Sequence, residues 1–214
     1  MSLPNGVTLA LATTYAAADT VSAVTNADPA VATTSGSHGI TNGNFLEVTS
    51  GWSRLNNRIV RAASASGTTV TYEGYDSSNT TSHPVGTGTG SVREITAWTQ
   101  ISQIMGASST GGDMQFVQYS FLEQDFQSQL PTEASPVTIT LDIADDPTLA
   151  GYIAVKAAAE SRALTGLKAT LPNGSIILYN GYVSLNQTPS FTKGQLMVVK
   201  ATFSLQGLPI RYAS

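Results

Sequence analysis

The sequence predicts a mainly β protein with one α-helix, and three observations indicate it. Serine, threonine, glycine and alanine abound, while only 11% of the 214 residues are charged, a composition that suits strands and turns better than helical bundles. Short segments with alternating apolar residues follow one another, separated by clusters of Gly, Asn, Asp and Pro. A single segment carries the start signals of a helix. The length suits one large β domain, or a compact domain with an inserted module.

The first third of the chain, to about residue 92, consists of short strands broken by turns. The strand-like segments are VTLALATTY, TVSAVT, AVATTS, FLEVTS, NRIVRA and TTVTYEGY. Spacing this regular predicts a meander or a small barrel. The stretch from residue 76 to 90 is polar and rich in glycine, with nothing to bury, so we expect a flexible connection or an exposed loop there.

Three strands are expected next, before the helix. VREITAWTQISQI and MQFVQYSFL are two long ones, separated by the glycine-containing loop GASSTGGD. The third strand alternates cleanly, and its inward face is predicted to hold Val137, Ile139, Leu141 and Ile143.

One helix is predicted over about residues 147–162. Asp146 is placed to cap the first free N–H groups, Pro147 suits the first helical position, and Gly166 is a plausible terminator. The residues expected to pack this helix on a sheet share one of its faces: Leu149, Tyr152, Ile153 and Ala157.

The segment LPNGSIILYNGYVSL, residues 171–185, has apolar side chains on both faces of one strand. Pro-Asn-Gly predicts the hairpin turn that leads into it. We expect its odd-numbered face, from Ile177 to Leu185, in the subunit core. The even-numbered face holds Ile176, Leu178 and Tyr182 and is predicted to be covered either by another subunit or by an inserted module. A last apolar strand follows, and the order strand, helix, hairpin, strand predicts a helix against a mostly antiparallel sheet.

The distribution of charge is uneven. The net charge of −4 argues against a nucleic-acid binder, which normally carries a basic stripe. Residues 94–154 include eight acidic side chains and no basic one, whereas residues 161–214 include five basic side chains and no acidic one. Segments charged in this way attract each other, within one subunit or between neighbours in a head-to-tail assembly. Charge alone leaves both alternatives open.

The sequence holds no recognisable catalytic constellation, so we expect neither enzymatic activity nor a catalytic, metal or cofactor-binding site. His38 and His83 lie in polar loops without the spacing of metal ligands, and we expect both to be solvated. Asp145 and Asp146 fit helix capping better than a catalytic pair. The lone tryptophans, Trp52 and Trp98, are expected in cores.

Cysteine is absent, which excludes a disulfide framework. No Lys or Arg precedes Arg54, so the basic region of a signal peptide is missing, and no apolar run approaches the roughly 18 residues that span a bilayer. We expect a soluble protein that is made without export.

The C-terminal part of the chain runs from ITLDIADDPTLAGYIAVKAAAES through the PNG hairpin and NGYVS to the last apolar strand. In this order of elements it resembles the major tail tube proteins of long-tailed (siphovirus) bacteriophages. The likeness covers about a third of the chain closely, and more than half once REITAWTQISQI and QYSFLEQDFQSQLPTEASP are included. TSGWSRLNNRIVRA and VTYEGYD also resemble a segment found in one branch of these proteins.

The resemblance implies an antiparallel β-barrel or sandwich flanked by one α-helix, with an extra N-terminal β module. It implies six-membered rings that stack into the tail tube of the virion, a conduit that DNA crosses during ejection without specific binding. The implied partners are other copies of the chain, a tape-measure protein, a tail terminator and tail-tip proteins. Assembly is expected in the host cytoplasm, with no membrane contact and no cofactors.

Within that expectation we divide the chain into a tube core and an insertion. Residues 1–19 with 93–214 form the core, and residues 20–92 form an inserted β-rich module or extended loops on the tube exterior. The candidates for the inter-subunit interface are Ile176, Leu178, Tyr182, Lys193 and Arg211. The candidates for the lumen or an acidic loop are Asp113, Glu123 and Asp125, because an acidic lining would repel passing DNA.

A rival interpretation is a secreted carbohydrate-binding or adhesin-like β module, which Ser/Thr-rich strands also suit. The missing signal peptide and the asymmetric charge argue against it.

Overall fold

The computed structural model describes residues 6–213 and contains fifteen strands and one helix in that range. The first five residues of the predicted tube core lie outside the described residues. The strands are β1 (Thr8–Tyr15), β2 (Asp19–Val24), β3 (Val31–Thr34), β4 (Phe45–Ser50), β5 (Arg58–Ser66), β6 (Thr69–Tyr72), β7 (Gly90–Ile101), β8 (Ile104–Thr110), β9 (Met114–Tyr119), β10 (Ser128–Ala134), β11 (Thr138–Ala144), β12 (Leu164–Thr170), β13 (Ile176–Asn186), β14 (Val198–Leu205) and β15 (Ile210–Tyr212), and the helix is α1 (Ala150–Ser161).

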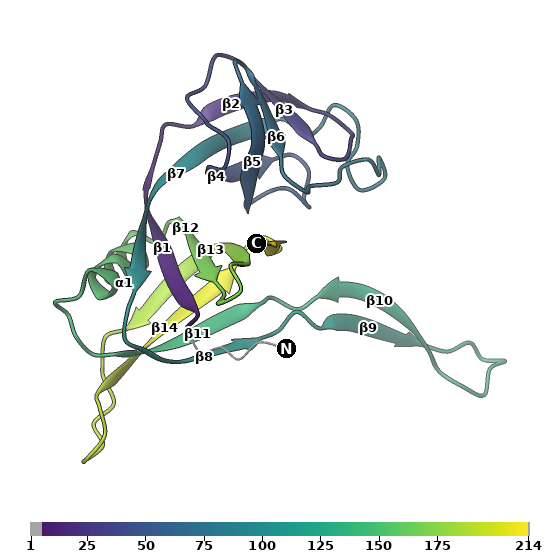
Figure 1. Ribbon diagram of the computed structural model, residues 1–214. Coiled ribbons are helices and arrows are strands. Elements are labelled where there is room, and N and C mark those ends of the chain that lie inside the picture. The colour runs from purple at the N-terminus through teal and green to yellow at the C-terminus, as the bar shows by residue number, and fades with distance from the viewer. Residues whose placement is uncertain (1–5, 214) are drawn as a thin grey trace.

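The N-terminal part of the chain folds into a barrel, at the top of Figure 1. Its strands follow the order β2-β3-β6-β5-β4-β7, and β2 also pairs with β7, which closes the ring of antiparallel strands. The barrel has its own core, in which Trp52, Leu55 and Tyr72 are fully buried. This N-terminal barrel is the small barrel that the regular strand spacing predicts.

The C-terminal part forms a curved sheet that stays open, in the order β7-β1-β12-β13-β14-β11-β8, with β15 added beside β13. Helix α1 packs on one face of this open sheet, against β13, β7 and β1. The apolar face of β14, with Val199, Ala201 and Phe203, and that of β11, with Leu141 and Ile143, are buried there. The predicted fold class is thereby confirmed: antiparallel strands, a barrel, one helix and an extra N-terminal β module. The closed barrel is the N-terminal module itself, and the helix flanks the open sheet.

Strand β7 belongs to both sheets. Residues 90–94 pair with β4, and residues 95–101 pair with β1 in the open sheet. At the crossing point the Arg93 guanidinium donates hydrogen bonds of 3.1 and 2.9 Å to the two carboxylate oxygens of Glu47, which is only 4% exposed. The same guanidinium lies 4.0 Å over the Tyr15 ring, whose hydroxyl accepts a hydrogen bond from the Gly166 N–H. One ion pair thus ties β4, β7 and β1 together.

The helix is shorter than the predicted range at both ends. It begins at Ala150 after Leu149, without a side-chain cap, because the Asp146 carboxylate instead accepts hydrogen bonds from the backbone N–H and hydroxyl of Thr148. It ends at Ser161, because the next residue, Arg162, has a left-handed φ of 53°, so the predicted terminator Gly166 is wrong. Gly166 lies in β12, where a β-carbon would come within 2.6 Å of the Ile59 side chain.

The buried face of the helix also differs from the predicted one. Gly151, Tyr152 and Val155 are buried, whereas Ile153 is 54% exposed. The reason is the close approach of the helix to β7: a β-carbon at Gly151 would lie 2.5 Å from the carbonyl oxygen of Gln100. A glycine in this position therefore decides which face turns toward the sheet, and the apolar pattern alone points to a slightly different one.

The polar stretch from residue 76 to 90 is mostly exposed, in keeping with the exposed loop that was one of the two predicted alternatives, but Ser77, His83 and Gly88 are buried in it. His83 is 5% exposed, its Nε2 is 2.9 Å from the Tyr75 hydroxyl, and the Asn26 amide donates to its carbonyl oxygen. The indole N–H of Trp52 donates to the carbonyl oxygen of Pro84. The expectation of a solvated His83 is wrong because this loop buries polar groups with hydrogen-bond partners, which hydrophobicity does not reveal.

The junction between the N-terminal barrel and the open sheet, where Arg93 pairs with Glu47, gives a first prediction. Replacing Arg93 with alanine leaves the buried Glu47 carboxylate unpaired, so we expect the free energy of unfolding to fall by about 3 kcal/mol at neutral pH. Burial already raises the pKa of Glu47, and Arg93 opposes that shift. Without Arg93 the pKa rises further, so the folded state favours the protonated carboxyl. The loss should therefore shrink as pH falls through this raised pKa.

Urea unfolding at several pH values measures this effect, with Arg93→Lys as the charge-conserving control. A loss that is independent of pH would contradict the role given to Glu47.

Candidate assembly surfaces

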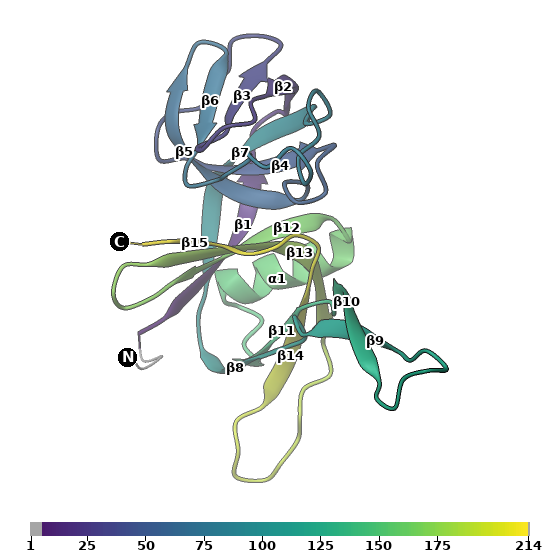
Figure 2. The same cartoon turned by 90° about the vertical axis from the view of Figure 1, so that its right-hand side faces the viewer.

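A two-stranded arm, residues 112–135, projects from the open sheet (Figures 1 and 2). It consists of β9 and β10, which pair with each other and form a separate sheet. At its base the Gly112 N–H donates to the Ser135 carbonyl and the Ser135 N–H to the Asp113 carbonyl, at 3.1 and 2.8 Å. Among the described residues no other helix or strand packs extensively on it.

Both faces of the arm are apolar. Phe116 lies opposite Pro131, and Val117 lies opposite Leu130 on the other face. The large apolar side chains that the arm exposes are Met114, Phe116, Val117, Tyr119, Phe121, Leu122, Phe126 and Leu130. Covering each gains about 1.5 to 3 kcal/mol, and an isolated two-stranded hairpin is only marginally stable in water. A surface of this kind marks an interaction site.

The charge of the arm is wholly acidic. The acidic candidates Asp113, Glu123 and Asp125 all lie on it and are exposed. The structure brings Glu123 and Asp125 together in the turn at the tip, whereas Asp113 lies at the base, one arm length away. The three acidic candidates therefore lie at two separate places on the arm.

The even-numbered face of β13 is covered by the chain itself over half its length. Leu178 is 1% exposed and lies in a cluster with Ile59, Ile95 and Tyr212, and Ile176 packs partly buried against the same cluster. Of the two covers left open by the sequence, the inserted module, through Ile59, is the one found here, together with β15. Leu178 is consequently part of the chain's own core.

The other interface candidates are exposed. Tyr182, on the same face of β13, keeps 44% of its surface. Lys193 lies in the loop between β13 and β14, which projects away from the sheet and exposes Phe191 and Leu196 (Figure 2). Arg211 lies on β15, opposite Ile177. The structure thus separates these three candidates rather than joining them in one patch.

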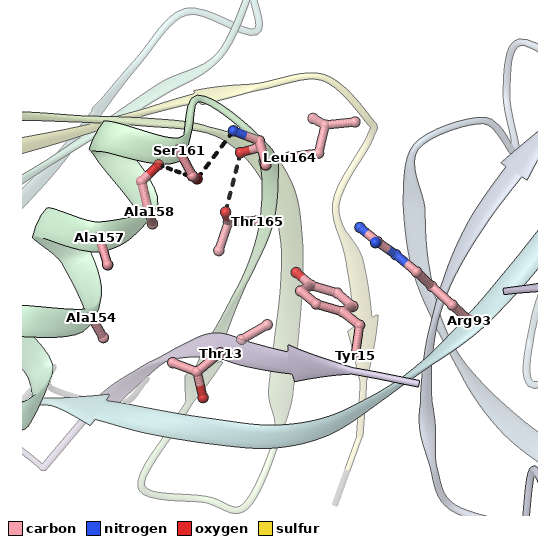
Figure 3. Close-up of a pocket in the computed structure, with 11 residues that line it drawn as sticks. Thr13, Tyr15, Arg93, Ala154, Ala157, Ala158, Ser161, Leu164 and Thr165 are labelled. Atoms are coloured by element: carbon pink, nitrogen blue, oxygen red, sulfur yellow. Dashed lines mark hydrogen bonds between the residues drawn. The ribbon is translucent and has the colours of Figure 1, made fainter. Parts of the chain in front are cut away.

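Several hollows lie on the body of the protein, and two of them border β1. One, of about 320 Å³, lies between α1 and β1 and is lined largely by alanine, serine and threonine (Figure 3). Its Ser161 and Thr165 hydroxyls donate to the Ala158 and Ala163 carbonyls, so they are already satisfied. The other, which we call the groove, lies between β8 and β11 on one side and β1, β12 and β13 on the other. It encloses about 280 Å³ and is mostly apolar.

Neither of these two hollows brings together the side chains of a catalytic or metal-binding site. Within residues 6–213 no three His, Asp or Glu side chains come close enough together to hold a metal ion. The helix of the described chain is too short to cross a membrane. The exposed apolar arm, rather than a pocket, is therefore the candidate functional site. In the sequence it is indicated by the apolar residues Phe116 and Val117, which are adjacent on one strand.

Comparison with known proteins points the same way. A family model described as phage tail tube protein matches residues 50–214. No curated protein matches the chain.

Among solved structures, similar chains occur in the virion of a native gene transfer agent particle and in the sheath/tube terminator of an extracellular contractile injection system in its extended state. The first shares 10% identity at a TM-score of 0.42, covering 54% of this chain and 89% of that one. The second shares 18% at 0.39, covering 50% and 84%. The family match is the finding that bears on function.

Because no other helix or strand of the described residues packs extensively on the arm, its removal should not disturb the body. We expect a variant in which a short Gly-Ser linker replaces residues 114–134 to keep the melting temperature of the full chain, measured calorimetrically where both are monomeric. A decrease of about 3 °C or more, equivalent to about 1 kcal/mol in a chain of this size, would show that the arm stabilises the body.

Proposed function

Because the chain belongs to the phage tail tube protein family and is thus a structural component of the virion tail, we propose that its copies close into rings, six to a ring, that stack into a hollow tube for DNA. The observation that carries this proposal is the arm. It is apolar on two faces, and the chain that bears it leaves both uncovered. Neighbouring subunits supply the cover.

Ring closure needs two different surfaces on each subunit, one that meets the next copy and one that meets the previous copy. The arm supplies an acidic apolar surface. The remaining candidates, Tyr182, Lys193 and Arg211, lie at three separate places, and two of them are basic. Opposite charge on two faces orients subunits head to tail and favours the correct neighbour over a reversed one.

We further propose that the N-terminal barrel, within the inserted module of residues 20–92, lies outside the tube wall. It meets the open sheet at one end, through β7, through the connection from β1 to β2, and through β5, which packs on β13 and β15 (Figure 1). It exposes few large apolar side chains, Val85 being the main one. A polar barrel held at one end suits an external decoration better than a wall element.

The remaining details come from the family and are proposals for this chain. DNA crosses the lumen without specific binding, and a tape-measure protein, a tail terminator and tail-tip proteins are the partners, with assembly in the host cytoplasm. The family suggests a non-enzymatic role, and we propose no catalytic activity. That Asp113, Glu123 and Asp125 line the lumen stays a prediction. The family match favours this function over a carbohydrate-binding module.

Replacing Phe116 and Val117 together with serine removes one anchor from each face of the arm. We expect this double variant to fold but to stay monomeric in sedimentation, whereas the wild-type chain forms rings or tubes visible by negative-stain electron microscopy. Gln115→Ser combined with Gln118→Ser, on the same strand, is the matched control and should assemble. Normal tubes from the Phe116/Val117 variant would refute the arm as the assembly element.

A second variant tests the exposed part of β13. Tyr182→Asp introduces a charge where the apolar surface is 44% exposed, so we expect a folded chain that polymerises poorly, because burying an unpaired charge in an interface is costly. Ser184→Asp, two residues further along the same exposed face, is the control. Analytical ultracentrifugation that finds unchanged polymer for Tyr182→Asp would remove this residue from the interface.

A further inference from the structure

The groove is a hollow on the apolar face of the open sheet. Its deeper lining, with Leu167 and Ala169, is buried, whereas Ile139, Ile177 and Tyr179 remain partly exposed. Helix α1 covers one part of this face, and none of the residues around the groove belongs to α1. The groove lies between β8 and β11 on one side and β1, β12 and β13 on the other. Its apolar lining includes Leu9, Ile139, Leu167, Ala169, Ile177 and Tyr179.

A cationic side chain lies beside this apolar lining. Arg211 on β15 lies directly opposite Ile177, and residues directly opposite in antiparallel strands point to the same side of the sheet. The Arg211 side chain is therefore on the groove side, where its charge lowers the pKa of Tyr179 against the larger effect of burial. Arg211 is exposed, and among the described residues it has no ion-pair partner.

The tip of the arm has the complementary properties. Phe121, Leu122 and Phe126 are exposed there, and Leu122 has no cover at all. Glu123 and Asp125 lie between Leu122 and Phe126 in the sequence. The Tyr119 and Phe121 rings meet edge to face with centroids 5.6 Å apart, which helps to hold the turn in one shape. The tip thus combines apolar anchors with two carboxylates, and the groove combines an apolar floor with a guanidinium.

The tip cannot reach the groove of its own chain. The arm leaves the body next to β8 and β11, which line the groove, and then runs away from it (Figures 1 and 2). Six residues of β9 at about 3.4 Å each put the tip some 20 Å from the base. The occupant therefore has to be another copy. We propose that the arm tip of a neighbouring subunit docks in the groove, with Glu123 and Asp125 beside Arg211.

This contact rests on the proposed tube and specifies which surfaces meet in it. Each chain carries one tip and one groove at different places, so the contact is heterologous and passes from copy to copy. It also removes Glu123 and Asp125 from the lumen, leaving Asp113 as the acidic candidate there.

The absence of native cysteine makes crosslinking a clean test. A chain with Leu122→Cys is mixed with a chain that carries Ser109→Cys on the groove wall, and the mixture is oxidised after assembly. We expect a disulfide-linked heterodimer. The control partner, Ser64→Cys on the exposed surface of the N-terminal barrel, should lose this product. Tubes without the heterodimer, or with equal yield from the control, would overturn the docking and leave the tube intact.

Charge reversal provides an independent test of the same contact. Arg211→Glu should lose assembly, and the combination with Glu123→Arg and Asp125→Arg should restore it, because the attraction is re-created with opposite signs. Lys156→Glu, the same charge change on the exposed side of α1, is the control. Normal assembly of the Glu123→Arg and Asp125→Arg chain without the change at Arg211 would overturn the proposal. A wild-type chain that never polymerises would instead overturn the proposed tube itself.

Discussion

The structure depends on one strand that belongs to two sheets. Because β7 pairs with β4 at one end and with β1 at the other, the register of the N-terminal barrel and that of the open sheet are fixed relative to each other. The buried Glu47 carboxylate at the crossing is tolerable only because Arg93 accompanies it. With this junction in place, Ile59 of the barrel comes to rest on Leu178 and covers one face of β13.

What the junction leaves uncovered is as informative as what it covers. The open sheet has a helix over part of its apolar face and a groove over the rest, while the arm carries apolar residues away from every core of the chain. A monomer of this kind has two exposed apolar surfaces, the projecting arm and the concave groove. The proposed tube gives the reason, since in it neighbouring subunits cover these surfaces for one another.

Local patterns in the sequence predict local structure well here. The alternation along β11 and β14 and the Asn173-Gly174 turn lead to the observed strands and hairpin. Long-range packing is what the sequence conceals. Which of two covers lies over Leu178, and the burial of His83 in a polar loop, depend on residues far away in the chain. Pro131 has no N–H to donate to a neighbouring strand. This fits the separate two-stranded arm in which it lies, but an edge strand of the main sheet would accept a proline equally well.

The position of the N-terminal barrel has a consequence for how such a chain can diversify. The barrel leaves the open sheet after Tyr15 and returns to it at Ile95, and these two residues are paired neighbours on β1 and β7. The two connections therefore lie side by side, the condition under which one folded domain can be exchanged for another. The same position could display a different domain, provided that the replacement again shields Leu178 from water.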